Sequence, residues 1–240
     1  MKIATKTLVI VPCYNEEGSL EQTIANLKGK IIDIATLDDT VSYIVINDGS
    51  SDNTKGICKK NQYPLIDIPF NLGLSNAVQT GMRYAHICGY DMAMQFDGDG
   101  QHLPEYIPEM IKCMLETSAD IVIGSRYVQK TSRSLRTLGG SLIKIAVKIA
   151  TGKKLSDPTS GMRLYNSKMI ERFASQINYD PEPDTLAYLI NQGIKVVEIP
   201  VTMQERKAGK SYLSALNAVS YMLRMFVSII IVQWFRAKEG

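Results

Sequence analysis

The chain has little of what would assign it quickly to a class of protein. Its net charge is only +3 over 240 residues, so the overall charge gives no argument for a nucleic-acid partner. Its four cysteines, Cys13, Cys58, Cys88 and Cys113, are scattered and form no Cys-x-x-Cys pair. This pattern predicts reduced, mostly buried thiols in a cytosolic protein, and it excludes a disulfide framework or a cysteine-based zinc site.

Long apolar runs, internal repeats, low-complexity tracts and Pro/Ser-rich linkers are also lacking. The apolar run Met225 to Phe235 has 11 residues, whereas a membrane-spanning helix needs about 20. A strand is expected within about seven residues of the N-terminus, which leaves no room for a signal peptide. With 45% hydrophobic and 21% charged residues, the composition is that of one large globular domain, with or without an appendage.

Apolar runs alternate with helical patterns along the first half of the chain. Strands are expected at 7–12, 43–48, 65–68, 92–96 and 120–124, and helices at 17–27, from 52, at 75–86 and at 104–116. Continuously apolar strands separated by helices predict an α/β fold with a largely parallel sheet and helices on both faces. Ligands of such sheets bind beyond the carboxyl ends of the strands.

The segment Asp97-Gly98-Asp99-Gly100-Gln101 follows the fourth expected strand. Two carboxylates so close together repel each other, and Mg2+ or Mn2+ would relieve that repulsion while also binding a substrate diphosphate. The carbonyl of Gln101 offers a further oxygen, and the glycines let a bulky anion approach the backbone. The alternative is an acidic surface turn, because Asp and Gly favour turns in any case.

Polar residues follow the other expected strands as well. The polar segments stand at 12–16, 47–52, 97–101 and 124–127. On one edge of a sheet they describe a crevice of nucleotide size, where Tyr14 would stack on a base and Asp48 would accept hydrogen bonds from base or ribose. In the alternative, Asp48 and Ser51 only cap the helix that starts near Asp52.

In their number and order, these segments resemble the family-2 glycosyltransferases of the GT-A fold, which is Rossmann-like. The matching segments are Val11–Glu16, Asn47–Asp52, Asn71–Gly73, Asp97–His102 and Gly124–Tyr127. Within that family the chain looks most like the polyprenyl-phosphate glycosyltransferases, which include dolichol-phosphate mannose synthases. That narrower likeness is carried by Asp157–Tyr165, Glu198–Val201 and Arg206–Ser211. The resemblance extends over about residues 5 to 215.

The resemblance implies roles by position, and the segments near the acceptor add others. The nucleotide-binding residues expected are Pro12, Tyr14, Glu16, Ile46, Asp48, Asp97 and Gly98. The metal ligands expected are Asp97, Asp99 and Gln101. The catalytic residues expected are Asp99, Arg126, Asp184 and Arg206. The residues expected to contact the acceptor phosphate are Arg133, Arg136, Lys210 and Ser211.

The chain departs from the dolichol-phosphate enzymes at Tyr212, where those enzymes have Lys just after the position of Ser211. Lys210 lies two residues earlier, and whether it takes over the phosphate contact stays open. The Lys210-Ser211-Tyr212 variant resembles bacterial sequences, and that resemblance implies UDP-glucose or UDP-N-acetylglucosamine rather than GDP-mannose as donor.

The role of Asp184 depends on the acceptor. A sugar hydroxyl needs a general base, whereas a lipid phosphate is already an anion and attacks without one. Asp184 is therefore a base or an orienting group, and a helix cap after Pro181 and Pro183 is the structural alternative. The resemblance implies a single displacement with inversion at the sugar carbon.

Two segments suit a lipid acceptor. In 142–150, Lys144 and Lys148 share one helix face and Ile145 and Ile149 another, as in membrane-surface helices. An ordinary helix packed on the sheet would give the same pattern.

The second segment, 213–235, is an apolar helix with one narrow polar stripe. The stripe consists of Asn217, Ser220, Tyr221, Arg224 and Ser228. A helix lying in the membrane interface is expected here. Docking on a membrane protein or another subunit, and a buried core helix, are the alternatives.

These patterns together predict a GT-A domain at 1–211 and an amphipathic, membrane-associated helix at 212–240. The expected activity is metal-dependent, inverting transfer of one sugar from a nucleotide diphosphate to a polyprenyl phosphate. The expected place is the cytosolic membrane face, with a small membrane protein or a further copy of the chain as a candidate partner. Alternatives are GDP-mannose as donor, extension of a glycan by a family-2 transferase, and a non-catalytic nucleotide-sugar-binding membrane adaptor.

Overall fold

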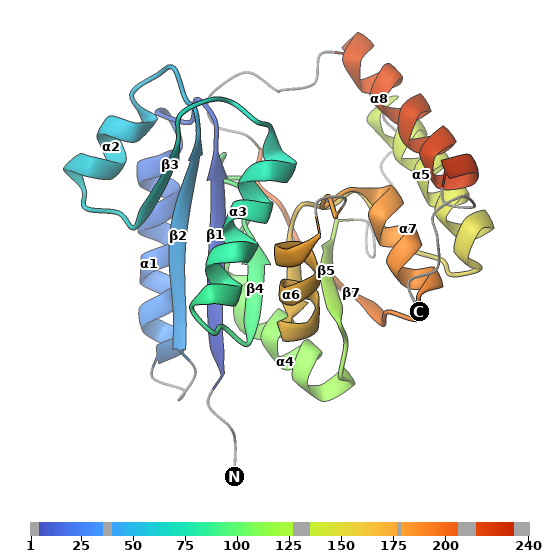
Figure 1. Cartoon of the computed structure of the whole chain (residues 1–240), viewed down its shortest axis with the longest axis horizontal. Helices are drawn as coiled ribbons and strands as arrows, with labels where there is room; N and C mark the ends of the chain where they lie inside the picture. The colour runs from blue at the N-terminus through green and yellow to red at the C-terminus, as the bar shows by residue number, and fades with distance from the viewer. Residues whose placement is uncertain (1–4, 36–39, 127–134, 177–178, 206–214, 233–240) are drawn as a thin grey trace.

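The computed structural model describes residues 5–35, 40–126, 135–176, 179–205 and 215–232. Within these residues, seven strands form one sheet in the order β3-β2-β1-β4-β6-β5-β7 (Figure 1). The strands are β1 (Lys6–Cys13), β2 (Thr40–Asp48), β3 (Leu65–Ile68), β4 (Met92–Gln95), β5 (Ile121–Ser125), β6 (Arg163–Asn166) and β7 (Val196–Pro200).

Helices connect these strands. They are α1 (Leu20–Ala35), α2 (Thr54–Lys60), α3 (Leu74–Ile87), α4 (Ile107–Thr117), α5 (Leu135–Thr151), α6 (Ser167–Ser175), α7 (Pro183–Asn191) and α8 (Ala215–Val227). A 3-10 turn at Pro104–Tyr106 precedes α4, and a π-helical segment at Ser228–Val232 continues α8. The order of the expected elements is confirmed. The first helix extends past the expected residue 27, because Ile31 and Ile34 prolong its apolar face.

The sheet is mostly parallel, as expected, but one strand runs the other way. β6 pairs antiparallel with both β4 and β5, and its first residue, Arg163, is the register partner of Gln95. Because β6 begins at the edge where the parallel strands end, the loop at 156–162 that precedes it lies at that carboxyl edge. The sequence pattern did not predict this strand, because it has only four residues and a polar one at each end.

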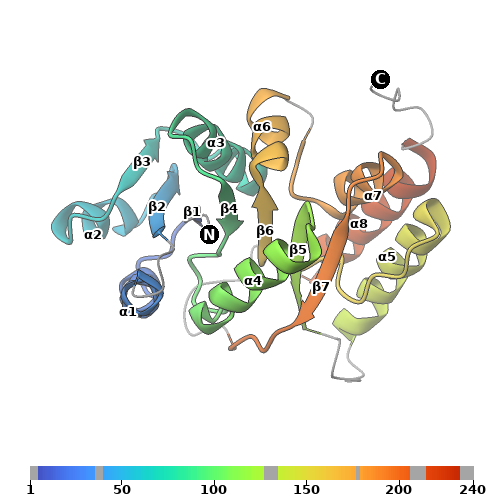
Figure 2. The same cartoon turned by 90° about the horizontal axis from the view of Figure 1, so that it is seen from below.

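Each face of the sheet supports its own hydrophobic core. In β1, Leu8 and Ile10 pack into one core, and Val9 and Val11 pack into the other, as the twofold alternation of a strand requires. Seen from below, α3 and α6 cover one face and α1 and α4 cover the other (Figure 2). Both faces are buried, which explains why the central strands are apolar at almost every position.

The C-terminal helix is packed on the body of the protein along one side. Met225 and Ile229 are buried in the core that α5 and α7 also enter. Leu223, Val227 and Ile231 on the opposite side are exposed. One side of the helix is thus buried, as the core-helix alternative predicted. The other side presents an apolar face to the outside. Over the described residues, every helix is too short or too polar to cross a bilayer.

All four cysteines are free thiols, as the sequence predicts. Cys13 and Cys58 are buried, but Cys88 is exposed, so the expectation of mostly buried thiols holds for half of them. Burial, followed by repulsion from Cys58 and Glu16, raises the pKa of the Cys13 thiol well above its ordinary value. Cys13 is therefore a weak nucleophile beside the site described below.

Gly81 lets α3 approach β1, since a Cβ there would lie 2.3 Å from Ile10 Cγ2. We expect Gly81→Ala to lower the free energy of unfolding by about 1–3 kcal/mol, because the added methyl overpacks this contact. Gly29→Ala is the matched control. Gly29 lies in α1, and a Cβ added there would meet open space. Alanine should therefore raise the free energy of unfolding by about 0.5–1 kcal/mol. Urea unfolding measures both, and equal effects would contradict the close packing of α3 on the sheet.

Candidate functional site

Hydrogen bonds join the loop after β1 to the loop after β2. Asn15 Oδ1 accepts the backbone N–H of Ser51 at 2.8 Å, and the Asn15 N–H donates to Ser50 Oγ at 3.0 Å. One residue further on, the N–H of Glu16 donates to Thr54 Oγ1 at 2.9 Å. Two polar segments that the sequence placed at strand ends therefore form one surface at the carboxyl edge of the sheet.

Glu16 and Ser19 extend this surface toward the acidic segment. The buried Glu16 carboxylate has Oε2 2.7 Å from the Ser19 hydroxyl, which also lies 3.0 Å from the Gly98 carbonyl oxygen. On the other side of Gly98, its N–H donates to the Pro12 carbonyl at 3.3 Å. The predicted nucleotide-binding residues Pro12, Glu16 and Gly98 are thus brought together.

Gly98 has to be a glycine for steric reasons. A Cβ at this position would lie 2.5 Å from Cys13 Sγ and 3.2 Å from the Pro12 carbonyl oxygen. The missing side chain allows the acidic loop to pack directly on the end of β1. The backbone of the acidic loop thereby lies beside the end of β1 and the residues that follow it.

Two neighbours, Gln95 and His102, fix Asp97. Its N–H donates to His102 Nδ1 at 2.9 Å, and its Oδ1 accepts the Gln95 amide at 3.0 Å. His102 Nε2 lies 3.6 Å from Asp97 Oδ2. Because Nδ1 accepts a hydrogen bond, the ring nitrogen that faces the carboxylate is the one that carries hydrogen. Gln95 and His102 are positioning residues for Asp97 that were not singled out from the sequence.

Asp99 forms a turn, as the alternative of an acidic surface turn at 97–101 predicted. Its Oδ1 accepts the N–H of Gln101 at 3.0 Å, an Asx turn. The Gln101 carbonyl in turn accepts the Gln204 N–H at 2.9 Å, so the acidic loop is tied to the segment that follows β7. A turn and an acidic site are therefore compatible here, because the turn uses one oxygen of Asp99 and leaves the carboxylate partly exposed.

The donor atoms fit a divalent ion that shares its ligands with a substrate. No group of three or more His, Cys, Asp or Glu side chains suited to a metal occurs in the described part of the chain. Asp97 and Asp99 carry carboxylate oxygens, the hard ligands that such an ion prefers, and a substrate diphosphate would have to provide further ligands. The backbone of the 156–162 loop closes around Asp97, since a Cβ on Gly161 would lie 2.7 Å from Asp97 Oδ2.

Asp48 holds a neighbouring loop. Its Oδ1 and Oδ2 accept the N–H groups of Leu72 and Gly73, each at 2.8 Å. The capping alternative is wrong for Asp48, because the N–H of Thr54 at the start of α2 bonds to Asp52 Oδ1. Each Asp48 oxygen has a second lone pair with which to accept a hydrogen bond from a nucleotide. That contact stays a prediction.

Two other predicted nucleotide contacts differ in exposure. Tyr14 is exposed at the carboxyl edge, where its ring can meet a base. The Ile46 side chain is wholly buried between the sheet and α3, so only its main chain could face a nucleotide.

Arg126 forms a bidentate pair with Asp157, a residue to which the sequence interpretation gave no role. Arg126 Nε donates to Asp157 Oδ2 at 2.6 Å, and Nη2 donates to Asp157 Oδ1 at 2.8 Å. The Asp157 side chain is wholly buried, whereas the Arg126 side chain is 36% exposed. The buried carboxylate therefore fixes a cation that still reaches the surface of the site.

The loop around Asp157 is held from both sides. Glu198 on β7 accepts the N–H groups of Ser156 and Asp157 at 2.6 and 2.7 Å. The buried Arg163 guanidinium donates to the carbonyls of Pro158 and Ser160, both at 2.8 Å. This loop presses Gly161 against Asp97, so its rigidity is part of the acidic site.

Asp184 lies in the first turn of α7 and is not the residue that caps it, since the N-cap is Glu182. Asp184 Oδ1 accepts the N–H of Thr185 at 2.7 Å, and Oδ2 accepts the hydroxyl of Ser228 at 2.6 Å. Glu182 accepts the hydroxyl of Tyr221. Burial raises the pKa of Glu182, and the hydrogen bond from Tyr221 and the charge of Arg163 oppose that rise.

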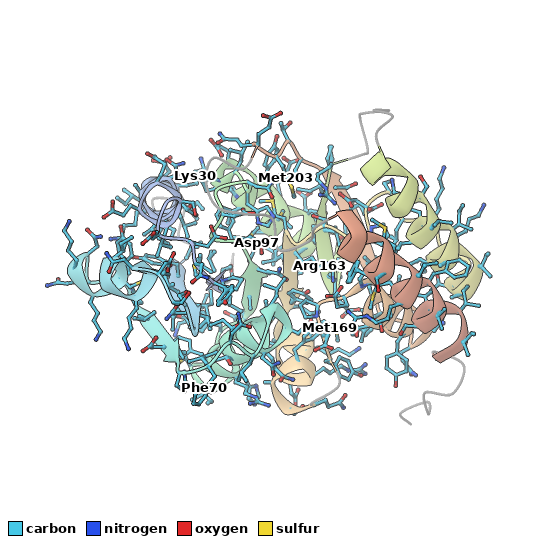
Figure 3. All side chains as sticks on the ribbon, turned by 90° about the horizontal axis from the view of Figure 1, so that it is seen from above. Lys30, Phe70, Asp97, Arg163, Met169 and Met203 are labelled. Carbon is cyan, nitrogen blue, oxygen red and sulfur yellow. The ribbon has the colours of Figure 1, made fainter. Side chains whose placement is uncertain are left out.

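The polar stripe of the C-terminal helix is therefore divided. Tyr221 and Ser228 face α7, whereas Ser220 and Arg224 are exposed. Seen from above, Arg163 lies between Asp97 and the α8 ribbon (Figure 3). The side chain of Asn217 lies outside the described residues.

Several predicted phosphate contacts fall outside the described part of the chain. These are Arg133, Arg206, Lys210 and Ser211, together with the side chain of Arg136 in α5. Their roles stay predictions.

Comparison with known proteins connects this site to an enzyme family. The family model Glycosyl transferase family 2 matches residues 8–173. An undecaprenyl-phosphate mannosyltransferase of Micrococcus luteus is 29% identical over 225 residues, covering 87% of this chain and 88% of its own. A polyprenol monophosphomannose synthase of Mycolicibacterium smegmatis is 28% identical over 234 residues, covering 92% and 85%. A UDP-N-acetylglucosamine–dolichyl-phosphate N-acetylglucosaminyltransferase of Methanococcus voltae is 25% identical over 217 residues, covering 80% and 83%.

Solved structures share the fold. A glucosyl-3-phosphoglycerate synthase from Mycobacterium tuberculosis, in complex with Mn2+, uridine-diphosphate-glucose and phosphoglyceric acid, has a TM-score of 0.67 at 17% identity. The match covers 98% of this chain and 82% of that one. A mannosyltransferase from Pyrobaculum calidifontis, in complex with GDP-Man and Mn2+, has a TM-score of 0.66 at 16% identity, covering 100% and 66%.

The family model spans more than half of the chain, and the strand-end motifs that suggested the resemblance lie within it. The structural matches add the sheet and its covering helices. This chain belongs to glycosyl transferase family 2, and it is a glycosyltransferase with a GT-A-like fold.

Proposed function

We propose that the enzyme transfers one sugar from a nucleotide diphosphate sugar to a polyprenyl phosphate at a membrane surface. The observation that carries this proposal is the likeness, over most of both chains, to relatives whose names include a polyprenyl-phosphate acceptor. These names include mannose and N-acetylglucosamine, so GDP-mannose is as well supported a donor as UDP-N-acetylglucosamine. UDP-glucose stays the second sugar that the Lys210-Ser211-Tyr212 variant favours.

Asp97 and Asp99 would hold Mg2+ or Mn2+ together with the donor diphosphate. When bound, the ion supplies positive charge that stabilises the leaving phosphate. The chain's own contribution is to fix the ligands in advance, since Gln95, His102 and the Gly161 backbone leave Asp97 little freedom. Such preorganisation is often the largest single contribution to catalysis.

Arg126 adds fixed positive charge at the same edge. Its guanidinium is oriented by Asp157 before any substrate arrives, and an arginine fork suits phosphate oxygens. Arg206 would add a second cation from the segment that follows Gln204, the residue bonded to Gln101. Both charges act on oxygens that become more negative as the sugar leaves.

The acceptor phosphate would attack the sugar carbon directly, with inversion. A phosphate oxygen is already anionic, so no side chain has to take a proton, and Asp184 orients the acceptor. Extension of a glycan is the competing function, and it would require Asp184 to act as a general base toward a hydroxyl. Both oxygens of Asp184 already accept hydrogen bonds from Thr185 and Ser228, which favours an orienting role.

The outer faces of α5 and α8 would rest on the membrane. The two helices contact each other and lie side by side at one end of the molecule (Figure 1). The exposed apolar residues of these two helices and of the π-helical segment that continues α8 are Leu142, Ile145, Ile149, Leu223, Val227 and Ile231. We call this set the α5–α8 apolar face. Ile143 and Val147 of α5 are buried underneath, so α5 both packs on the body and presents apolar side chains to the outside.

The division of the chain into a catalytic part at 1–211 and a C-terminal segment at 212–240 stays a prediction, and Met225 and Ile229 of that segment share a hydrophobic core with the catalytic part. The helix would make the enzyme peripheral or monotopic at the cytosolic membrane face. Every helix within the described ranges is too short or too polar to span a bilayer, which agrees with a surface contact. A partner membrane protein or a second copy of the chain is the alternative occupant of the α5–α8 apolar face.

The first prediction concerns transfer itself. The enzyme should move radiolabelled sugar from its nucleotide donor into an organic-soluble lipid when undecaprenyl phosphate is supplied. Chelation of divalent ions, or Asp99→Ala, should reduce this transfer by about 100-fold or more, because the charge on the leaving phosphate is no longer balanced. Asp33→Ala, an exposed aspartate of α1, is the matched control and should leave transfer unchanged.

Other outcomes of this assay distinguish the alternatives. Label found only in water-soluble saccharide, together with loss of turnover in Asp184→Asn, would assign the enzyme to glycan extension. Metal-independent nucleotide binding without any transfer would favour a binding module.

The second prediction concerns Gly161. Gly161→Ala should push Asp97 out of place, because the new Cβ would lie 2.7 Å from its Oδ2. We expect about a tenfold rise in the Mn2+ concentration that gives half-maximal transfer, without loss of the folded state. Gly29→Ala is the control, because its Cβ meets nothing. An unchanged Mn2+ requirement in Gly161→Ala would remove Asp97 from the metal site.

The third prediction concerns the α5–α8 apolar face. Ile145 and Ile149 are 52% and 68% exposed, and Ile32 and Ile87, at 68% and 81%, lie on other helices. The double change Ile145→Ser/Ile149→Ser should weaken sedimentation with anionic vesicles about tenfold or more, since each buried isoleucine contributes about 1.5–3 kcal/mol. The double change Ile32→Ser/Ile87→Ser should have no effect. Unchanged vesicle binding with loss of a dimer in ultracentrifugation would assign this face to a second copy.

A further inference from the structure

Two hydroxyls on the inner side of the C-terminal helix donate hydrogen bonds to carboxylate side chains at the start of α7. Ser228 Oγ donates to Asp184 Oδ2 at 2.6 Å, and the Tyr221 hydroxyl donates to Glu182 Oε2. Tyr221 and Ser228 are two helical turns apart and therefore share one face of the helix. These contacts connect a C-terminal element to the predicted acceptor side of the site.

The topology places the start of α7 at the catalytic edge. β7 follows α7 and runs parallel to β5, so it begins at the amino edge of the sheet. α7 therefore runs from the carboxyl edge toward the amino edge, and Glu182 and Asp184 lie at its start, on the carboxyl side of the sheet. Arg163, the register partner of Gln95, exerts its charge on Glu182 from the same edge.

Ser228 leaves the Asp184 carboxylate little rotational freedom. One oxygen is held by the N–H of Thr185 and the other by the Ser228 hydroxyl. The first contact is local to α7, whereas the second comes from an element 44 residues away in sequence. Removal of the Ser228 hydroxyl would release one oxygen of Asp184 without disturbing the apolar contacts of Met225 and Ile229.

The opposite face of the same helix is apolar and exposed at Leu223, Val227 and Ile231. One helix thus carries the outer surface proposed for the membrane and the inner hydroxyls that hold the two acids. A shift of this helix on the body of the protein would move Ser228 and Tyr221 together. The position of the acids is therefore linked to the seating of the C-terminal helix.

We propose that Ser228 and Tyr221 are positioning residues that hold Asp184 and Glu182 in the orientation the lipid-phosphate acceptor requires. The C-terminal helix is then part of the acceptor site and not only an anchor. The proposal rests on the proposed function, since it takes the acceptor phosphate to bind beside Asp184.

The test compares Ser228→Ala with Ser220→Ala in the full-length chain on vesicles that contain undecaprenyl phosphate. Ser220 lies on the same helix with an exposed side chain, so it is a matched control. Ser228→Ala should lower kcat/KM for the lipid about tenfold, with donor KM and vesicle sedimentation within twofold of the parent chain. Ser228→Thr, which keeps the hydroxyl, should restore most of the rate. Tyr221→Phe should act in the same direction, since it removes the hydrogen bond to Glu182.

Hydrogen exchange gives a readout that needs no acceptor. Backbone amides at 184–190 should exchange faster in Ser228→Ala than in Ser220→Ala, because the first turn of α7 loses its hydrogen bond to the C-terminal helix. Equal kinetics and equal exchange in the two variants would overturn the proposal. So would a loss of vesicle binding or a rise in donor KM as large as the lipid effect, because Ser228 would then serve only the fold or the anchor.

The two proposals fail in different ways. A parent chain that transfers no sugar to lipid phosphate refutes the proposed function. Faster exchange at 184–190 in Ser228→Ala would in that case still support the link between the helix and Asp184, and unchanged exchange would refute it.

Discussion

The wholly buried carboxylate of Asp157 is the constraint on which the site depends. A buried charge is strongly unfavourable unless it is paired and hydrogen-bonded, and here Arg126 supplies both from the end of β5. Glu198 binds the backbone on the other side of the same residue. The loop can hardly move without leaving the charge unpaired, so it forms a fixed wall for the acidic site.

This wall determines where the other charged groups stand. It ends in β6, whose antiparallel direction brings Gly161 against Asp97 and directs the chain on toward α6 and α7. Arg163 binds the loop from inside the protein and exerts its charge on Glu182. The C-terminal helix then contacts Glu182 and Asp184 through Tyr221 and Ser228. The sides proposed for donor, acceptor and membrane are thus joined through one short loop and one short strand.

Much of this could be predicted from the sequence, and the rest depends on pairings that periodicity does not show. The alternation of apolar strands with helices predicted the sheet, and the polar strand ends predicted the loops that meet at its carboxyl edge. The pairing of Arg126 with Asp157 joins residues 31 positions apart, so no local pattern marks it. The π-helical and helical residues after Ala215 are apolar on two sides, and hydropathy alone does not tell a buried side from an exposed one. The antiparallel strand β6 was not predicted from the sequence, because its four residues include an arginine and an asparagine and form no apolar run.

The central claim is that this arrangement transfers a sugar to a lipid phosphate. The most direct measurement is mass spectrometry of the lipid extract after the chain has been incubated with undecaprenyl phosphate, Mn2+ and UDP-glucose, UDP-N-acetylglucosamine or GDP-mannose in turn. One of these donors should give a lipid whose mass has risen by a single sugar residue linked to the phosphate. An unchanged lipid with all three donors, while the nucleotide sugar is consumed and the sugar appears on a soluble hydroxyl acceptor, would contradict the account.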